Sequence, residues 1–149
     1  MFEIESKNPE EITINTKTTS ITFNFVDFMI DANLNVGKIY GPGEFEIGDA
    51  TIRAIDVKKG KTIYDVEVLG VHVGILGDIV DGLDDLGMAN ILCTSSIRAV
   101  REIEPKIVIA TGNVDEMVSE LKLTAEVEKK VKVKNVDSLP TSLRVVILK

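Results

Sequence analysis

Apolar side chains alternate with polar ones at every second position through most of the first half of the chain. Two such runs, residues 12–14 and 21–25, are separated by the polar residues 17–19, and two more flank the pair 48–49. A period of two points successive side chains to opposite faces of a strand, so these runs predict half-buried strands joined by hairpin turns. With a further turn at Gly70, the first half is expected to form an antiparallel meander.

The second half of the chain changes to an alternation of strand and helix. Residues 91–93 and 107–110 are short apolar runs, and between them apolar residues recur at helical spacing until Pro105 ends the helix. This pattern is typical of a βαβ unit, and apolar alternation over residues 125–133 and 143–148 adds later strands. The chain is therefore expected to be an α/β protein with helices covering a sheet.

Length and composition limit the chain to one soluble domain. The 149 residues, 44% of them hydrophobic, suit a single packed core, and no repeat or linker divides them, so residues 1–149 are expected to form one domain. No apolar run approaches the roughly 20 residues that cross a bilayer, so no membrane partner is expected. A formal net charge of -7 also disfavours nucleic acid, whose phosphates are bound through Lys and Arg.

The cysteine and histidine counts restrict the chemistry further. One cysteine cannot form an internal disulfide, and the first residues have neither the basic nor the apolar region of a signal peptide, so a cytoplasmic location is expected. One histidine leaves few ways to bind a metal or to catalyse proton transfer.

Six segments of the chain follow the order of motifs in a known protein family. They are residues 41–48 (GPGEFEIG), 52–55 (IRAI), 62–64 (TIY), 76–78 (LGD), 103–109 (IEPKIVI) and 143–149 (LRVVILK). Together they resemble the short prokaryotic Zn-dependent hydrolase-like branch of the metallo-β-lactamase family. The resemblance implies a shortened αββα sandwich, with mostly antiparallel sheet in the first half and βαβ units in the second.

The resemblance also implies a metal site, but most of its ligand positions are changed or absent. Family members bind metal through an HxHxDH loop, a mid-chain histidine, the aspartate of an HLGD motif and the histidine of a PMHY motif. By this resemblance only the aspartate remains, as Asp78, while Ile75 and Gly112 replace two histidines and residues 26–40 and 56–61 are too short for the histidine loops. Because zinc takes three or four ligands, no metal or other cofactor is expected.

The other catalytic candidates are more simply interpreted as structural residues. His72 is expected on a solvent-facing or half-covered strand surface, and Cys93 is expected to be a small core residue without a base to activate it. A triad of Ser95 or Ser96 with His72 and Asp78 is conceivable, but nothing in the spacing supports it. Whether the protein is an enzyme stays open, but these residues favour a protein without catalytic activity.

Acidic and glycine-rich stretches offer two further binding hypotheses. The carboxylates of Asp78, Asp81, Asp84 and Asp85 could take Mg²⁺ or Ca²⁺, but they lack the order of a calcium loop and suit the start of a helix. Residues 41–43 (GPG) could form a phosphate loop, but strand residues follow them rather than a helix. Both stretches are therefore interpreted as structural.

Lysines alternate with valines late in the chain. They are Lys129, Lys130, Lys132 and Lys134, with Val131 and Val133 between them. This pattern predicts a strand with one solvated face, whose lysines discourage pairing at a sheet edge.

The ends of the two strands in the βαβ unit are a candidate binding site, because open α/β sheets bind ligands at such ends. Thr94, Ser95, Gly112 and Asn113 follow these strands and, with Asp78, form a candidate ligand cleft for a small anion. Ser95 and Asn113 can equally be ordinary helix caps.

These observations favour a pseudoenzyme, a metallo-β-lactamase-like domain that has lost its metal and acts in binding or homo-oligomeric assembly. Shortening a sandwich exposes sheet edges that invite pairing with another chain, so a homo-oligomer, in its simplest form a dimer, is expected. Two alternatives stay open. One is a residual metal-dependent hydrolase using Asp78 with a carboxylate-bound divalent ion, and the other is a sensor of small anions or nucleotides near Ser95 and Gly112.

Overall fold

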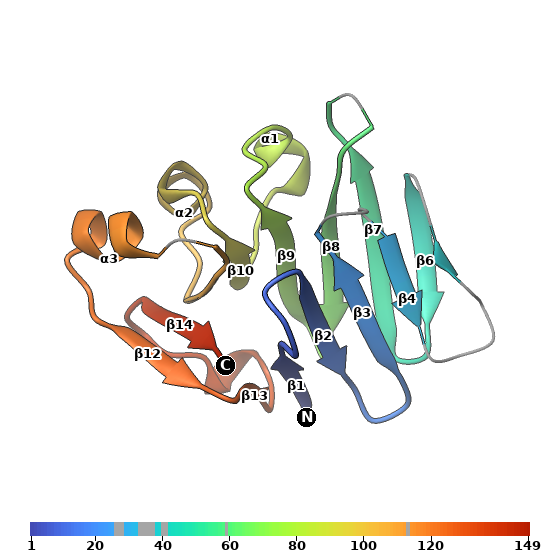
Figure 1. Ribbon diagram of the computed structural model, residues 1–149. Helices are drawn as coiled ribbons and strands as arrows, with labels where there is room; N and C mark the ends of the chain where they lie inside the picture. The colour runs from blue at the N-terminus through green and yellow to red at the C-terminus, as the bar shows by residue number, and fades with distance from the viewer. Residues whose placement is uncertain (26–28, 33–37, 40–41, 59, 113) are drawn as a thin grey trace.

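The protein is a sandwich of two β-sheets, with helices packed on the outer face of the larger sheet (Figure 1). The computed structural model describes residues 1–25, 29–32, 38–39, 42–58, 60–112 and 114–149. The chain builds the smaller sheet first, then the larger, and returns one late strand to the smaller sheet. The expected α/β class, with an antiparallel first half and a βαβ second half, is confirmed.

The smaller sheet has six strands and is antiparallel throughout. In spatial order they are β13 (Lys130–Val133), β1 (Phe2–Glu5), β2 (Glu11–Asn15), β3 (Ser20–Asn24), β4 (Met29–Ala32) and β5 (Lys38–Ile39). The period-two pattern decides which face is buried, since Phe2 and Ile4 of β1 and Ile21 and Phe23 of β3 all turn inward. The opening residues of the chain therefore supply strands of this sheet.

The larger sheet has eight strands and changes from antiparallel to parallel at β9. In spatial order they are β12 (Ala125–Glu128), β14 (Arg144–Leu148), β11 (Ile107–Ala110), β10 (Ile91–Thr94), β9 (Val71–Gly77), β8 (Thr62–Val68), β7 (Ala50–Asp56) and β6 (Gly43–Ile47). β6 to β9 form the expected meander, and β9, β10, β11, β14 and β12 are mutually parallel neighbours. At the β8–β9 turn both Leu69 and Gly70 have positive φ, as a two-residue hairpin requires.

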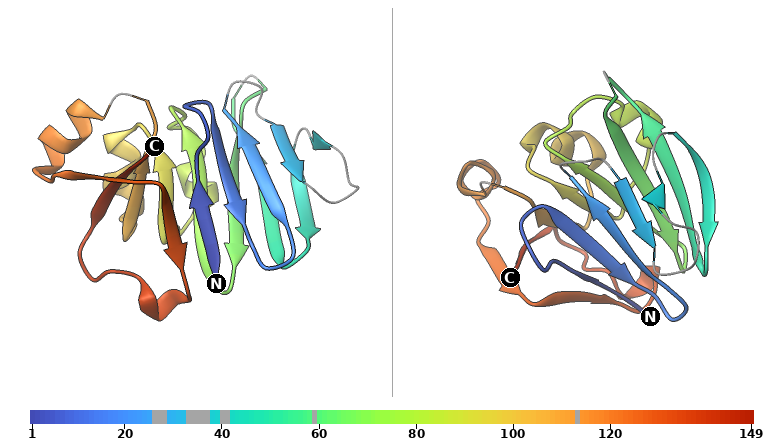
Figure 2. Two further views of the ribbon diagram at one scale, coloured as in Figure 1. Left: turned by 60° about the horizontal axis from the view of Figure 1, so that its bottom comes forward. Right: turned by 45° about the vertical axis from the view of Figure 1, so that its right-hand side comes forward.

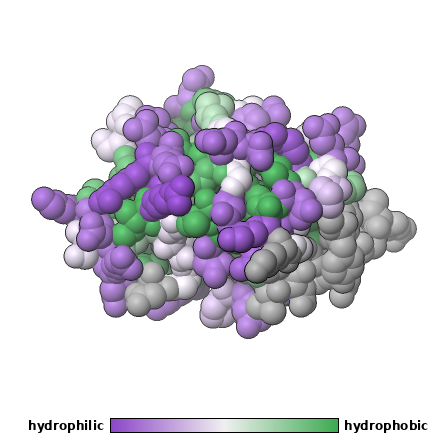
Figure 3. Space-filling view, turned by 90° about the horizontal axis from the view of Figure 1, so that it is seen from above, coloured by the Kyte–Doolittle hydropathy of each residue, from purple (hydrophilic) through white to green (hydrophobic). Residues whose placement is uncertain are grey.

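Short helices cover the outer face of the larger sheet. They are α1 (Leu83–Leu86), α2 (Ile97–Ile103) and α3 (Asp115–Leu121), and a 3-10 turn, η1 (Val136–Ser138), precedes β14. Leu92 and Val108 of the sheet share an apolar cluster with Leu86, Val100 and Met117 of the helices. Seen from above, polar side chains cover much of the surface and apolar atoms show between them (Figure 3). None of the helices described is long and apolar enough to span a membrane.

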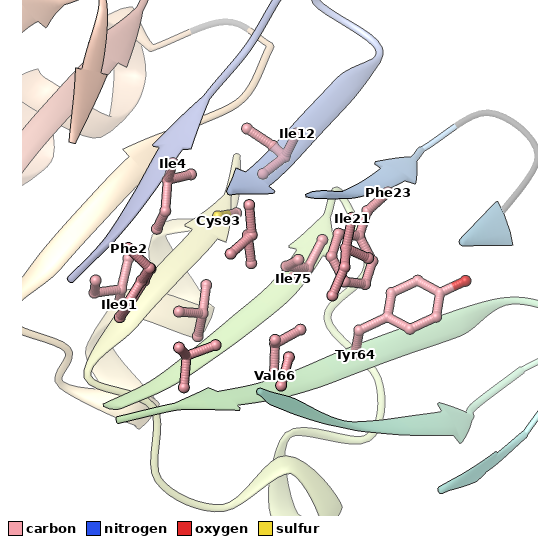
Figure 4. Packing of buried hydrophobic residues seen from close by; sticks show 14 of the residues in the cluster. Phe2, Ile4, Ile12, Ile21, Phe23, Tyr64, Val66, Ile75, Ile91 and Cys93 are labelled. Atoms are coloured by element: carbon pink, nitrogen blue, oxygen red, sulfur yellow. The ribbon is translucent and has the colours of Figure 1, made fainter. Parts of the chain in front are cut away.

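The inner core fills the space between the two sheets (Figure 4). Ile4 and Phe23 enter it from the smaller sheet, and Tyr64, Ile75 and Cys93 enter it from the larger one. The rings of Phe23 and Tyr64 lie 5.1 Å apart between centroids, at an interplanar angle of 57°. Ile75, which stands where the resemblance places a histidine, is 1% exposed and belongs to this apolar core.

Residues 125–133 form two strands in different sheets, although their alternation continues without interruption in the sequence. β12 pairs with β14 in the larger sheet, the chain bends at Lys129, and β13 pairs with β1 in the smaller sheet (Figure 2). Val131 and Val133 turn into the core while Lys130 and Lys132 are exposed, so the prediction of one solvated lysine face is confirmed.

Hydrogen bonds join the hairpin tips of the two sheets at one end of the sandwich. The carboxylate of Asp49, in the β6–β7 turn, accepts hydrogen bonds from the hydroxyls of Thr16 and Thr18, the latter at 2.7 Å. Burial acts to raise the pKa of Asp49, but these bonds and backbone amides outweigh it and hold that pKa below its ordinary value. Gly48 has a φ of 60°, and a Cβ there would lie 2.5 Å from the Thr18 hydroxyl.

Candidate functional site

A hollow of about 270 Å³ lies beside Asp78, where β9, β10 and β11 end. Asp78 is exposed and follows β9, Ser95 follows β10, and Gly112 follows β11. Phe25, which follows β3 of the smaller sheet, lines the hollow together with residues 9–10 of the β1–β2 loop. The hollow therefore lies at one edge of the sandwich, between the strand ends of one sheet and a loop of the other.

The hydroxyls of Thr94 and Ser95 are directed to the backbone. The carbonyl oxygen of Gly77 accepts hydrogen bonds from the Ser95 amide at 2.9 Å, from Thr94 Oγ1 at 3.1 Å and from Ser95 Oγ at 3.4 Å. Thr94 Oγ1 in turn accepts from the Ser96 amide at 3.0 Å. These bonds fix the ends of β9 and β10 side by side, where the ladder between them is interrupted by a bulge.

The structure brings together three residues of the expected ligand cleft. Asp78, Ser95 and Gly112 line the same hollow, while Thr94 is fully buried and does not line it. Asn113 lies outside the described residues. A ligand-binding role for these residues stays a prediction.

The helix caps differ from the expectation. The N-cap of α2 is Ser96, whose Oγ accepts from the Ala99 amide at 3.2 Å, and not Ser95. The cap position of α3 is Val114, which makes no side-chain cap hydrogen bond. The cap of α2 and the side chain that lines the hollow thus belong to adjacent residues, Ser96 and Ser95.

A second hollow, of about 350 Å³, adjoins the first. It is lined by Ser6 and Lys7 of the β1–β2 loop, by Phe25, and by the ends of β11 and β14 up to Lys149. Residues 111–112 border both hollows. Sequence reasoning missed this hollow because it needs a loop of one sheet to cover strand ends of the other, and no local pattern encodes that contact.

The one histidine belongs to a polar cluster on the outer face of the larger sheet. Its Nδ1 lies 3.0 Å from Asp65 Oδ1, and Arg53 donates to Oδ2 of the same carboxylate at 3.4 Å. Arg53 also donates to the Leu86 carbonyl at 3.0 Å, which ties β7 to the end of α1. The His72 side chain is 27% exposed, so the expected half-covered strand position is confirmed.

No catalytic triad forms from the serines, His72 and Asp78. The carboxylates beside His72 are those of Asp65 and Glu67, and the Ser95 hydroxyl donates to the Gly77 carbonyl. Cys93 is fully buried, and burial raises the pKa of its thiol to about 12, so it is not a nucleophile at neutral pH.

A solved structure shares this arrangement of sheets and helices. It is a protein from Thermotoga maritima, described as a candidate Zn-dependent hydrolase of the metallo-β-lactamase superfamily, and it superposes with a TM-score of 0.74 over 99% of each chain. The chain has the metallo-β-lactamase fold. At 13% sequence identity this likeness establishes the fold. No family model matches the sequence, and no curated protein matches it by sequence.

Zinc, which the metallo-β-lactamase fold implies, does not fit the described residues. They contain no group of three or more His, Cys, Asp or Glu side chains able to hold a metal ion. The hollow beside Asp78 has only Glu10 as a second carboxylate among its described lining residues, and it has no imidazole or thiolate there. A zinc site needs three or four such ligands, which this lining does not supply.

Proposed function

We propose that this protein is a non-catalytic domain of the metallo-β-lactamase fold that acts in binding or homo-oligomeric assembly. The observation that carries the proposal is the lining of the hollow beside Asp78. It retains one carboxylate of the implied metal site, while Phe25, Ser95 and Gly112 form much of the remaining wall. Without ligands to activate a water molecule, the hydrolytic chemistry of a zinc centre has no support there.

The catalytic part of this proposal is tested by metal analysis and activity together. Protein purified without chelator is expected to carry no stoichiometric zinc and to leave phosphate and carboxylate esters unchanged. Hydrolysis that needs Mg²⁺ or Mn²⁺ and is lost in Asp78→Asn would instead support the residual hydrolase. Stoichiometric zinc would contradict the proposal directly.

The assembly part is tested by light scattering over a series of protein concentrations. A dimer is the expected form, because closed two-fold pairing is the commonest way that identical chains associate. A monomer throughout the series would remove assembly from the proposal and leave binding to other molecules.

The second hollow favours one further candidate function, the binding of a small anion with an apolar part. Its volume of about 350 Å³ is within the range of small-molecule sites, and its apolar lining includes Ile109, Ile147 and Leu148. Two basic side chains, Lys7 and Lys149, line it against one acidic side chain, Glu11. A thermal-shift screen with small carboxylates and nucleotides tests this, since a ligand at 100 times its Kd adds about 2.7 kcal/mol of stability. No shift across the panel would count against this candidate.

A further inference from the structure

A groove of about 520 Å³ lies at the opposite ends of β11 and β14 from the two hollows. It is lined by six successive residues, 128–133, by residues 138–140, and by Ile107 and Arg144. Ile107 begins β11 and Arg144 begins β14, whereas the hollows lie where these strands end. This groove, called the β13 groove below, is therefore separate from the Asp78 hollow.

The backbone edge of β13 borders the groove. Successive residues of a strand point to opposite faces, so a surface that touches all four residues of β13 runs along the edge of that strand. β13 is the terminal strand of the smaller sheet, and β1 is its one partner among the strands described. An edge strand has N–H and C=O groups that point away from its one partner, and such groups can pair with an added strand.

The groove is basic although the protein is acidic. Lys129, Lys130, Lys132 and Arg144 line it against one acidic residue, Glu128, while the whole chain carries a formal charge of -7. Lys130 pairs with Glu3 at 3.1 Å and Arg144 pairs with Glu126 at 2.6 Å. Lys129 and Lys132 have no ion pair in the part of the chain that the structure describes. Local positive charge of this kind discourages pairing with a neutral or basic strand and attracts carboxylates.

The pairing of β1 with β13 shows which side chains suit a neighbour of β13. Opposite Val133, Lys132, Val131 and Lys130 stand, in order, Phe2, Glu3, Ile4 and Glu5. Acidic residues thus face lysines, and apolar residues face valines. A strand added on the free edge meets the same lysine and valine side chains, so the same alternation suits it.

We propose that the β13 groove binds an extended segment of another protein in which acidic and apolar residues alternate. Main-chain hydrogen bonds to β13 hold the segment, its carboxylates face the lysines, and its apolar side chains cover the mouth of the sandwich beside Val131 and Val133. The proposal goes beyond the Asp78 hollow and holds whether or not that hollow is catalytic.

A second copy of this chain suits the groove less well. The acidic edge strands described are β6, with Glu44 and Glu46, and β12, with Glu126 and Glu128. Each already has a neighbour, β7 or β14, so either would bring its own sheet into a groove that residues 138–140 also line. A single extended segment brings no second strand with it.

The test is fluorescence anisotropy of the full chain with three labelled short peptides. The first alternates Glu and Val, the second alternates Lys and Val, and the third is the Glu–Val peptide N-methylated at every amide. The Glu–Val peptide is expected to bind, and to bind less tightly as salt screens the lysines. The other two are expected to bind at least about tenfold more weakly, a difference of about 1.4 kcal/mol.

A charge-reversal variant keeps the test independent of folding. Lys129→Glu/Lys132→Glu is expected to lose binding of the Glu–Val peptide and to gain binding of the Lys–Val peptide. An unfolded protein would not exchange one peptide for the other in this way. The matched control is Lys58→Glu/Lys61→Glu, which makes the same change of charge in the β7–β8 connection and is expected to keep the original preference. An unchanged preference in the groove variant overturns the proposed site.

Two other outcomes also decide against the proposal. Equal binding of the N-methylated peptide overturns strand addition, because that peptide has no amide donors. The last measurement is the oligomeric state of the protein without peptide, by light scattering. A dimer that Lys129→Glu/Lys132→Glu dissociates, while the control variant leaves it intact, would show that a second copy occupies the groove.

Discussion

At the scale of single residues, a hydroxyl next to a candidate site does not by itself mark a ligand-binding group. Thr94 was expected in the ligand cleft, yet it is fully buried and bonds to the Gly77 carbonyl and the Ser96 amide. The Thr94 hydroxyl therefore holds the ends of β9 and β10 together. Asp78, in contrast, is exposed and lines the hollow without a hydrogen bond to any described residue.

Thr94→Val is expected to destabilise the fold. Valine keeps the shape but leaves the Ser96 amide without its partner, which costs about 1 to 3 kcal/mol, while the Gly77 carbonyl keeps its bond from the Ser95 amide. Chemical denaturation measures the loss. Thr111→Val is the matched control, because the Thr111 hydroxyl is half-buried beside the same hollow and bonds to none of the described residues. Equal losses in the two variants would contradict the structural role of Thr94.

Asp49 is expected to make stability depend on pH in the acid range. Its pKa is lower in the folded protein than the ordinary value of 3.8, so it contributes stability above that value and loses the contribution as pH falls through the folded pKa. Melting temperatures of wild type and Asp49→Asn should differ at neutral pH and converge in acid. The contribution is small because Asp49 is exposed. A gap that widens in acid would contradict the direction of the shift.

At the scale of elements, the start of α2 distinguishes two neighbouring serines. Ser96→Ala removes the side-chain acceptor of the Ala99 amide and is expected to cost about 1 kcal/mol. Ser95→Ala removes only the 3.4 Å bond to Gly77 and is expected to cost less. Denaturation of the two variants compares their stabilities directly. A larger loss of stability in Ser95→Ala than in Ser96→Ala would contradict the assignment of the cap to Ser96.

Elements whose signals are local were predictable, and those decided by distant contacts were not. The hairpin at Gly70 and the βαβ unit follow from periodicity and turn residues a few positions apart. The bend at Lys129 has no such signal, because alternation runs through it and the change of sheet depends on pairing with β14 on one side and β1 on the other. For the same reason Asp78 and Ser95 could be placed at strand ends, whereas Phe25 could not be placed beside them.

At the scale of the whole molecule, apolar packing and hydrogen bonds hold the two sheets of the sandwich together. The space between the sheets is filled by apolar side chains, including Ile75 at a position where the resemblance places a ligand. The strand ends around Asp78 are joined instead by hydrogen bonds to Gly77. These contacts all come from the described residues of the chain itself.

The stability of the chain is accordingly expected to be independent of zinc. A metal that binds only the folded protein raises its stability with concentration, by about 2.7 kcal/mol at 100 times Kd, and a chelator reverses the effect. Melting temperatures with added zinc, with EDTA and with neither should agree for wild type and for Asp78→Ala. If zinc raises the wild-type value and Asp78→Ala abolishes that rise, a metal site exists at the Asp78 hollow. A rise that both proteins share would place the metal away from the Asp78 hollow.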